Sequence, residues 1–354
     1  MNAMVTVGHG GLEKIVYHNN WPRPEPKAGE VLIRVRACGL NNTDVNTRTG
    51  WYSKTVNEAT TGYAFEKVGE ADSTWGGKPI TFPRIQGADV CGEIVGVGDD
   101  ISASRIGQRV ITDGWLRDPI DPFNKNKTGY FGSECDGGFA DYTVIPSSNA
   151  LSINSNLTDA ELATFSCSYS TAEGMLNRAN VTKIDTVLVP GASGGVGGAL
   201  IQLSKRRKAR VIALASEAKH EDVISLGADK VLPRSPKNIK RALDNERISV
   251  VADVVGGDLW QEWIDILDRG GRYVCSGAIG GPMVGFDLRT LYLRDLTFYG
   301  STVLEPKVTI DLVRYIEAGE VKPCLAAKFK LNELREAQEA FIAKEHTGNI
   351  VVTT

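Results

Sequence analysis

A glycine-rich loop is the feature of this 354-residue sequence that most restricts its fold. The loop reads Gly191-Ala192-Ser193-Gly194-Gly195-Val196-Gly197, and it directly follows a continuous apolar run at 186–189. A stretch typical of a helix, 196–205, begins within the loop. Glycines in such a turn let backbone N–H groups approach a pyrophosphate, and the helix N-terminus adds partial positive charge. We therefore predict a dinucleotide-binding site here.

The segments behind this loop alternate between two patterns. Apolar runs typical of strands lie at 210–215, 231–232, 250–255 and 272–275, and stretches typical of helices lie at 219–226 and 260–267. Unbroken apolar strands that alternate with helices predict a parallel sheet covered on both faces.

The first part of the chain has a different pattern. Four short segments, 30–38, 92–97, 109–112 and 142–145, are either alternately apolar and polar or continuously apolar. No long stretch with helical periodicity separates them. This pattern predicts an antiparallel, barrel-like or sandwich-like domain. The pattern changes near Thr158, which is typical of a helix N-cap.

The alternation stops near Gly300. Helices are predicted at 307–318 and 332–343, an extended stretch at 328–331, and a last strand at 350–352 that could return to the N-terminal β domain. We expect an α/β fold with a mostly β domain formed by 1–168 and 303–354, and a dinucleotide-binding domain formed by 169–302.

Two long excursions, 53–82 and 114–138, interrupt the β part and are rich in Gly, Pro, Asn and Asp. Structureless loops of this length are uncommon without a function, so we expect surface segments of which either could cover a ligand site. Tyr63, Phe65 and Trp75 in the first excursion could line an aromatic pocket or mediate a subunit contact.

Composition excludes several classes of function. The net charge of −3 provides no general basic field for nucleic acid, and the basic run 205–208 fits a helix C-terminus. The six cysteines lie far apart and form no CxxC pair. There is no signal-like N-terminus and no apolar run approaching ~18 residues, so we expect a cytoplasmic protein without a membrane or nucleic-acid partner.

The second strand of the predicted sheet bears on the choice of cofactor. An acidic residue at its end would bond the ribose 2′-OH of NAD, but Ala215 and Ser216 stand there. A hydroxyl at Ser216 with cations at Lys219 and Arg234 could hold a 2′-phosphate, which predicts NADP(H). Glu217 is the residue that would favour NAD if it turned inward.

The whole chain resembles the medium-chain dehydrogenase/reductase superfamily, and within it the zinc-free quinone oxidoreductase-like group of the zinc-type alcohol dehydrogenase-like proteins. The matching pieces, in chain order, are 21–26 with 29–31, 38–44, 87–89 with Gly92 and Gly96, 136–142, the glycine loop, 226–229, 270–272 and 346–351. The resemblance implies a GroES-like catalytic domain, a Rossmann domain, a site between them, and a homodimer or homotetramer. It also implies cofactor contacts at Thr171, Val255 and Gly277.

The zinc ligands of metal-dependent relatives are incomplete in this sequence. Asn41 stands where the first Cys is expected and Ala88 where the His is expected, although Asp89 and Cys167 match the remaining positions. A catalytic zinc requires three good N or S donors, so we predict no metal. We expect Cys167 to be a small buried side chain rather than a nucleophile.

Without a metal, hydride transfer suits acceptors that delocalise charge themselves, such as quinones and α,β-unsaturated carbonyls. The resemblance suggests Asn41, Asp44 and Tyr52 as the groups that hold the developing oxygen anion. Each has a structural alternative: a backbone contact for Asn41, a helix cap for Asp44 and packing for Tyr52. The alternative functions are an alcohol or aldehyde dehydrogenase and a weakly catalytic NADPH-binding sensor or interaction protein.

Overall fold

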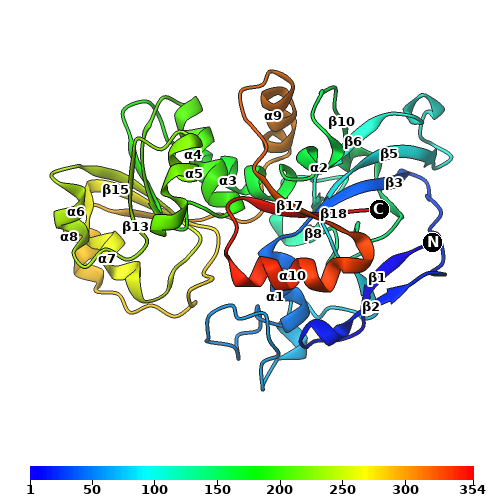
Figure 1. The fold of residues 1–354 in the computed structure, drawn as a ribbon, viewed down its shortest axis with the longest axis horizontal. Helices are drawn as coiled ribbons and strands as arrows, with labels where there is room; N and C mark the ends of the chain where they lie inside the picture. Colours follow the sequence, from blue (N-terminus) through cyan, green and yellow to red (C-terminus); the bar gives the residue numbers. More distant parts are fainter.

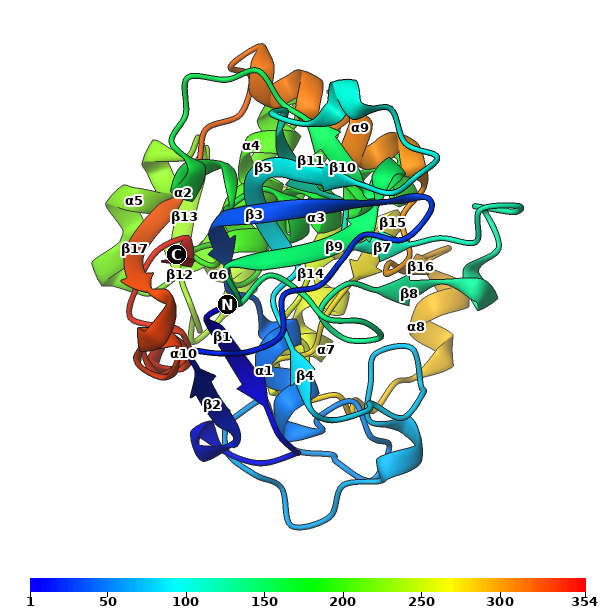
Figure 2. The same ribbon diagram turned by 90° about the vertical axis from the view of Figure 1, so that its right-hand side faces the viewer.

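A computed structural model of the chain describes residues 1–354, apart from the side chain of Glu70. One half of the molecule holds a parallel sheet between helices, and the other half is mostly β and contains both termini (Figure 1). Figure 2 views this β-rich half with the two chain ends in front. The chain therefore starts and finishes in the same half, as the predicted return of the last strand requires.

The parallel sheet has six strands in the order β13-β12-β11-β14-β15-β16. Their bounds are β11 (Thr186–Val189), β12 (Arg210–Ala215), β13 (Lys230–Pro233), β14 (Ile248–Asp253), β15 (Leu267–Cys275) and β16 (Thr297–Gly300). The order reverses between β11 and β14, and such a switch point is where open α/β sheets bind ligands. The predicted Rossmann fold is confirmed.

Alternate side chains of these strands fill two cores. Val187 and Val189 pack toward α3 (Ser166–Arg178) and α4 (Gly195–Arg206), whereas Leu188 packs toward α6 (Ile239–Leu243) and α7 (Trp260–Asp265). The period-two direction of strand side chains makes both faces of the sheet apolar. The remaining helices of this half are α5 (His220–Ser225) and α8 (Leu288–Leu293).

The β-rich half is built on a seven-stranded sheet with the path β10-β6-β5-β3-β18-β17 and β9 paired to β3. These strands are β3 (Glu30–Gly39), β5 (Asp89–Val97), β6 (Arg109–Thr112), β9 (Tyr142–Pro146), β10 (Ala150–Ser152), β17 (Leu325–Lys330) and β18 (Asn349–Thr353). The last strand, β18, pairs antiparallel with β3. The predicted return of the C-terminal strand to the β domain is thus confirmed.

Smaller elements complete this half. They are β1 (Ala3–Thr6), β2 (Ile15–His18), β4 (Arg84–Ile85), β7 (Trp115–Leu116), β8 (Gly129–Tyr130), α1 (Asn42–Thr49), α2 (Asp159–Leu162), α9 (Pro306–Glu317) and α10 (Leu334–Ala343). The helix start at Thr158 is confirmed: its backbone N–H donates to Glu161 Oε2 at 2.8 Å, and its hydroxyl accepts from the Glu161 N–H.

Three sequence expectations need correction. Leu267 starts β15 rather than ending a helix, because its side chain completes the core beside Trp263. Helix α1 follows β3 although its sequence has no clear apolar periodicity. The excursion 114–138 is a surface loop only in its middle, where residues 119–123 and 125–127 are exposed, because Trp115, Tyr130 and Phe131 near its ends are buried in the core of the β-rich half.

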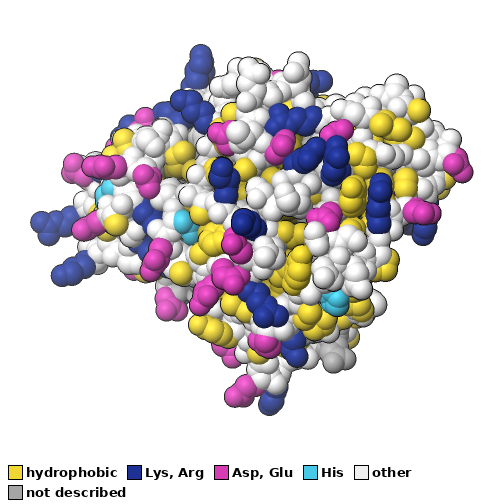
Figure 3. Space-filling model, turned by 45° about the vertical axis from the view of Figure 1, so that its right-hand side comes forward, with side chains coloured by type: hydrophobic (Ala, Val, Ile, Leu, Met, Phe, Trp, Pro, Cys, Tyr) yellow, Lys and Arg dark blue, Asp and Glu magenta, His cyan; other side chains and the backbone are white. Residues whose placement is uncertain are grey.

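Basic and acidic side chains are interspersed on the face drawn in Figure 3. The basic run 205–208 lies at the C-terminal end of α4 and forms ion pairs. Lys205 pairs with Asp229, and Arg207 pairs with Glu173. Among the described residues, each helix is too short or too polar to cross a bilayer.

Arg48 on α1 is a fully buried cation that joins three separate segments. Its guanidinium donates to the Gly10 carbonyl at 2.6 Å, to the Gly62 carbonyl, and to Gln338 Oε1 on α10 at 3.2 Å. Burial lowers the pKa of Arg48 to about 10, so the group remains charged at neutral pH. This residue ties the N-terminal segment and the first excursion to α10.

Replacing Arg48 with Met is expected to lower the free energy of unfolding by about 2–4 kcal/mol, because buried carbonyl oxygens lose their donor. Urea denaturation followed by circular dichroism measures the change. The matched control is Arg36→Met. The Arg36 side chain is 45% exposed in a surface pair with Glu93, and its replacement should change stability by less than about 0.5 kcal/mol. Equal effects in the two variants would contradict this role of Arg48.

Candidate active site

The glycine loop adopts the geometry that a pyrophosphate needs. Gly191 has φ of +64°, a left-handed conformation that favours glycine, and Gly194 is the N-cap of α4. A Cβ on Gly197 would overlap the Gly191 carbonyl oxygen, so this glycine lets helix and strand pack closely. A Cβ on Gly194 would meet nothing closer than 3.5 Å, which leaves open space above the N–H groups. The loop therefore fits a bound diphosphate.

The other residues predicted to contact the cofactor lie at the carboxyl ends of neighbouring strands. Val255 follows β14, and its side chain lies against Gly191, since a Cβ there would come within 2.9 Å of Val255 Cγ2. Gly277 follows β15, and its carbonyl accepts from the Cys275 thiol at 3.2 Å. Ser216 follows β12 and is exposed. These residues surround the switch point of the sheet.

Lys219 and its neighbours form a basic cluster beside the end of β12. The Lys219 ammonium donates to the backbone carbonyls of Lys344 and His346, each at 2.7 Å. Burial and the nearby Arg234 lower the pKa of Lys219, whereas burial and Lys219 lower the pKa of Lys344 to about 7. Cations that destabilise one another in this way favour an anionic ligand.

The C-terminal segment 346–349 contacts the glycine loop directly, which the sequence reasoning did not predict. The Gly348 N–H donates to the Ser193 carbonyl at 2.8 Å, and Gly194 forms a parallel bridge with Gly348. Ser168 donates to Asn349 Oδ1 at 2.8 Å, and a Cβ on Gly195 would overlap that same oxygen. The signal for this contact is the His-Thr-Gly-Asn run, which carried the family resemblance but no assigned role.

Two buried carboxyl groups lie beside the N-terminus of α3. Asp44 accepts the N–H groups of Asn41 at 2.8 Å and Gly87 at 3.2 Å, so the expected alternative of a cap is also met. Asp89 accepts the Cys167 N–H at 2.9 Å. Burial is the main cause that raises the pKa of Asp44 to about 7, and burial with the Asp44 charge raises that of Asp89 to about 8.

Phenol and thiol groups complete this cluster. Burial raises the pKa of Tyr52 to about 12, and its hydroxyl bonds the side chains of Thr43 and Asn46. Burial and the Asp89 charge raise the pKa of Cys167 to about 12, and its thiol interacts with Tyr130 and Thr171. The thiol is therefore protonated at neutral pH, in line with a non-nucleophilic Cys167. Tyr130 was not among the predicted site residues.

The side chains present do not fit a catalytic zinc. Asn41 and the buried Ala88 occupy two ligand positions, and no group of three His, Cys, Asp or Glu side chains suited to a metal occurs among the described residues. Asn41 is 8% exposed, and within the described part of the chain its amide nitrogen has no partner that meets full hydrogen-bond geometry. The Asn41 side chain adjoins Asp89, and a donor without a well-aligned partner at this place suits an oxygen atom of a ligand.

Two aromatic residues of the first excursion, Tyr63 and Trp75, have different environments. Tyr63 is 74% exposed, so it does not wall a pocket within the chain. Trp75, in contrast, packs on Trp115 and Tyr130.

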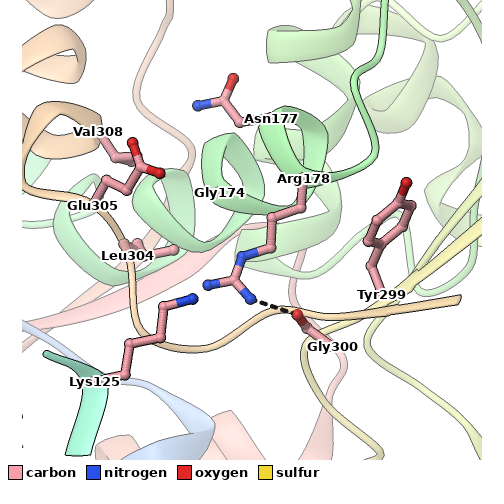
Figure 4. Close-up of a pocket in the computed structure, with 9 residues that line it drawn as sticks. All are labelled: Lys125, Gly174, Asn177, Arg178, Tyr299, Gly300, Leu304, Glu305 and Val308. Atoms are coloured by element: carbon pink, nitrogen blue, oxygen red, sulfur yellow. Dashed lines mark hydrogen bonds between the residues drawn. The ribbon is translucent and has the colours of Figure 1, made fainter. Parts of the chain in front are cut away.

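A cavity of about 320 Å³ lies at the opposite end of α3. In Figure 4, Arg178 points toward Gly300, whose carbonyl it bonds at 2.6 Å, and Lys125 lies nearby. Cys167 and Arg178 are separated by about three helical turns, roughly 16 Å, along α3. This cavity is therefore separate from the site at the glycine loop.

The comparisons with known proteins agree with this geometry. The alcohol dehydrogenase GroES-like domain matches residues 27–155, and the zinc-binding dehydrogenase family matches residues 195–318. The acryloyl-coenzyme A reductase of Metallosphaera sedula is 27% identical, with 100% of both chains covered. The quinone oxidoreductase of Homo sapiens is 25% identical, with 99% of this chain and 97% of that protein covered.

A crystal structure from Sinorhizobium meliloti 1021, of a protein assigned as an alcohol dehydrogenase, superposes with a TM-score of 0.90. It is 41% identical and covers 100% of this chain and 96% of that one. The parallel sheet, the glycine loop and these relatives define an oxidoreductase of the dinucleotide-binding kind. The chain belongs to the medium-chain dehydrogenase/reductase superfamily.

Replacing Gly194 with Ala is expected to weaken dinucleotide binding about 10- to 100-fold, because a methyl group would occupy the open space where the diphosphate approaches. The φ of −80° at Gly194 suits any residue, so the thermal midpoint should stay within about 2 °C of the wild type. Calorimetry with NADPH and NADH measures the affinity. Gly285→Ala, at a position with no atom within 4 Å, is the control that should bind normally. Unchanged affinity in Gly194→Ala would contradict the assignment of the loop.

The two raised carboxyl pKa values predict how stability depends on pH. The folded state keeps protons on Asp44 and Asp89 up to about pH 7 and 8, whereas the unfolded chain releases them near pH 4. The free energy of unfolding should thus fall as pH rises from about 5 to 8, by up to about 1.4 kcal/mol per pH unit for each extra proton held. Asp89→Asn should flatten this slope, and the exposed Asp99→Asn should not. Urea titrations from pH 5 to 9 give the slopes, and equal slopes in all three proteins would refute the prediction.

Proposed function

We propose that this protein is an NADPH-dependent reductase of quinones or α,β-unsaturated carbonyl compounds that works without zinc. The observation that carries the proposal is the buried Asn41 amide, which stands where a metal site would need a thiolate. Its nitrogen lies beside Asp89 and has no partner of full hydrogen-bond geometry among the described residues. The protonated phenol of Tyr52 and thiol of Cys167 belong to the same cluster. Such a site provides hydrogen-bond donors to an oxygen atom but no Lewis acid. The named activities of the acryloyl-coenzyme A reductase and quinone oxidoreductase relatives support it.

The chain's own groups account for the chemistry that the substrate needs. When bound, NADPH would supply a hydride from its nicotinamide ring. A conjugated acceptor moves the resulting negative charge to its oxygen, where the Asn41 amide stabilises it as a hydrogen-bond donor. Reduction also takes up one proton per substrate, and Asp44 and Asp89 retain protons near neutral pH. Tyr52 holds Thr43 and Asn46 on α1 and so positions this cluster.

The basic cluster supports NADPH rather than NADH. Lys219 lies one short turn beyond Ser216, at the end of the strand that positions the adenosine ribose. Arg234 stands near enough to lower the pKa of Lys219. Glu217 is exposed. A dianionic 2′-phosphate would relieve the repulsion between these cations.

An alcohol or aldehyde dehydrogenase is the second candidate. The relative from Sinorhizobium meliloti supports it, and Asp89 and Cys167 match the zinc-dependent pattern. Asn41 and Ala88 do not match it. The two candidates differ in what they require: a dehydrogenase of simple alcohols needs an electrophile for the alcohol oxygen, which this site lacks without added metal.

The proposal predicts NADPH oxidation with 1,4-benzoquinone, 2-cyclohexenone or crotonaldehyde, followed at the nicotinamide absorbance band. Dialysis against a chelator should leave the rates within about twofold, because no metal takes part. Ethanol and butanol with NADP⁺ are the controls and should give no turnover. Zinc-dependent oxidation of these alcohols would establish the second candidate, and inactivity with the whole panel would reject the reductase.

Lys219→Met is expected to raise the KM for NADPH about 10- to 100-fold and to leave the KM for NADH within about threefold, because only NADPH carries the 2′-phosphate. Lys237→Met, which removes an exposed cation outside the cluster, is the control. Steady-state kinetics with both cofactors measures the effect. If Lys219→Met raised the two KM values equally, Lys219 would serve the domain contact rather than cofactor selection.

A further inference from the structure

The cavity at the C-terminal end of α3 is large enough for a small molecule and lies between the two halves of the protein. Its volume is about 320 Å³, and small-molecule sites begin at roughly 300 Å³. One wall comes from α3 and β16, and the other comes from the start of α9 and from Lys125 in the excursion 114–138. A molecule bound here would therefore contact both halves.

Two cations in this cavity have no acidic partner. The Arg178 guanidinium donates to the carbonyls of Gly300 and Val303, each at 2.6 Å, but it forms no ion pair among the described residues. The Lys125 ammonium has neither an ion pair nor a hydrogen bond within the described part of the chain. In Figure 4, the Lys125 side chain extends toward the Arg178 guanidinium. Both groups can therefore donate to one anionic group.

Other cations close to the cavity are already neutralised by acids. Arg207, which also bonds the Asn177 side chain, pairs with Glu173 at 2.7 Å. Lys127, two residues after the cavity-lining lysine, pairs with Asp118 at 3.3 Å. The two unpaired cations are thus a property of the cavity and not of the surface around it.

The wall formed by the start of α9 is apolar apart from one carboxylate. Leu304 and Val308 are 4% and 6% exposed, and Gly174 makes room for this wall, because a Cβ there would come within 2.2 Å of Leu304 Cδ2. The Glu305 carboxylate points away from both cations in Figure 4, and it has no ion pair among the residues that the structure describes.

These charges select the kind of anion that the cavity can hold. Two cations and one carboxylate leave a single net positive charge, which one carboxylate of a ligand would neutralise. Guanidinium and ammonium groups bind carboxylates through short, charge-assisted hydrogen bonds. A second negative charge on the ligand would approach Glu305 and be repelled, which is how a site rejects a related ligand.

We propose that this cavity is a binding site for a small organic monocarboxylate with an apolar body, separate from the glycine loop and the polar cluster. The ligand carboxylate pairs with Lys125 and Arg178, and its body lies on Leu304 and Val308. Glu305 discriminates against dicarboxylates. This inference goes beyond the proposed function and does not depend on it. Because a ligand that binds only the folded state stabilises it, the monocarboxylate should raise the thermal midpoint.

The test compares hexanoate with adipate, its dicarboxylate of equal chain length, and with hexanol, its uncharged counterpart, by titration calorimetry. Hexanoate should bind at least about tenfold more tightly than either compound, because hexanol lacks the charge and adipate meets Glu305. Saturating NADP⁺ should leave the hexanoate affinity within about twofold, because the glycine loop lies at the other end of α3.

Two variants test the residues. Lys125→Met is expected to weaken hexanoate binding about 5- to 10-fold without changing the fold, since this side chain makes no contact that the structure needs. Lys127→Met, from the same turn but outside the cavity, is the matched control and should bind hexanoate within about twofold of the wild type. Glu305→Gln should strengthen adipate binding at least about threefold more than hexanoate binding.

These readouts separate this site from the proposed function. The absence of binding heat with hexanoate at about 10 mM, or equal affinities of Lys125→Met and the wild type, overturns the site. Loss of hexanoate binding with NADP⁺ would place the ligand in the nucleotide site and also overturn it. Equal effects of Glu305→Gln on the two acids overturn the role of Glu305. A protein that binds hexanoate as described but reduces no acceptor keeps this site and loses the reductase function.

Discussion

The contact between the last strand and the glycine loop is the constraint on which the rest of the structure depends. Strand β18 belongs to the β-rich sheet, yet the residue just before it, Gly348, bonds the Ser193 carbonyl and bridges Gly194. Asn349 then reaches Ser168 at the start of α3, next to Cys167. One short segment therefore fixes the distance between the loop that would hold the nucleotide and the polar cluster that would hold the substrate.

Burial limits the negative charge on the polar cluster formed by Asp44, Asp89 and Cys167. Burial raises the pKa of Asp44 to about 7, that of Asp89 to about 8 and that of the Cys167 thiol to about 12, so Asp44 is partly protonated and the other two groups are mostly protonated at neutral pH. Under the proposed function, groups that hold protons in place of a divalent cation would act as hydrogen-bond donors and not as a Lewis acid. Because these groups are buried, ionising them costs free energy. The protons that the cluster could donate and the free energy of unfolding therefore decrease over the same pH range.

Much of the fold could be predicted because it depends on local patterns. The apolar strands, the glycine loop and the cap at Thr158 all act within a few residues of their own sequence, and each was placed correctly. Arg48, Tyr130 and Asn349 could not be found in this way, because their partners lie far away in the chain. The ends of the excursion 114–138 were misjudged for the same reason. Their glycines and polar residues conceal Trp115 and Tyr130, which pack in the core against residues far away in the chain, Trp75 among them. The domain boundaries at 168/169 and 302/303, and the roles given to the site residues, stay predictions.

The hydrogen bonds of Lys219 have a consequence for how a nucleotide would be received. An ammonium group has three N–H donors. In Lys219, two of them bond the carbonyls of Lys344 and His346, which lie between α10 and β18. These two bonds leave at most one N–H for a further acceptor, and they fix its direction. An incoming phosphate would thus meet a cation whose side-chain entropy has already been lost during folding, and the affinity gained from it would not be reduced by ordering a flexible lysine at the moment of binding.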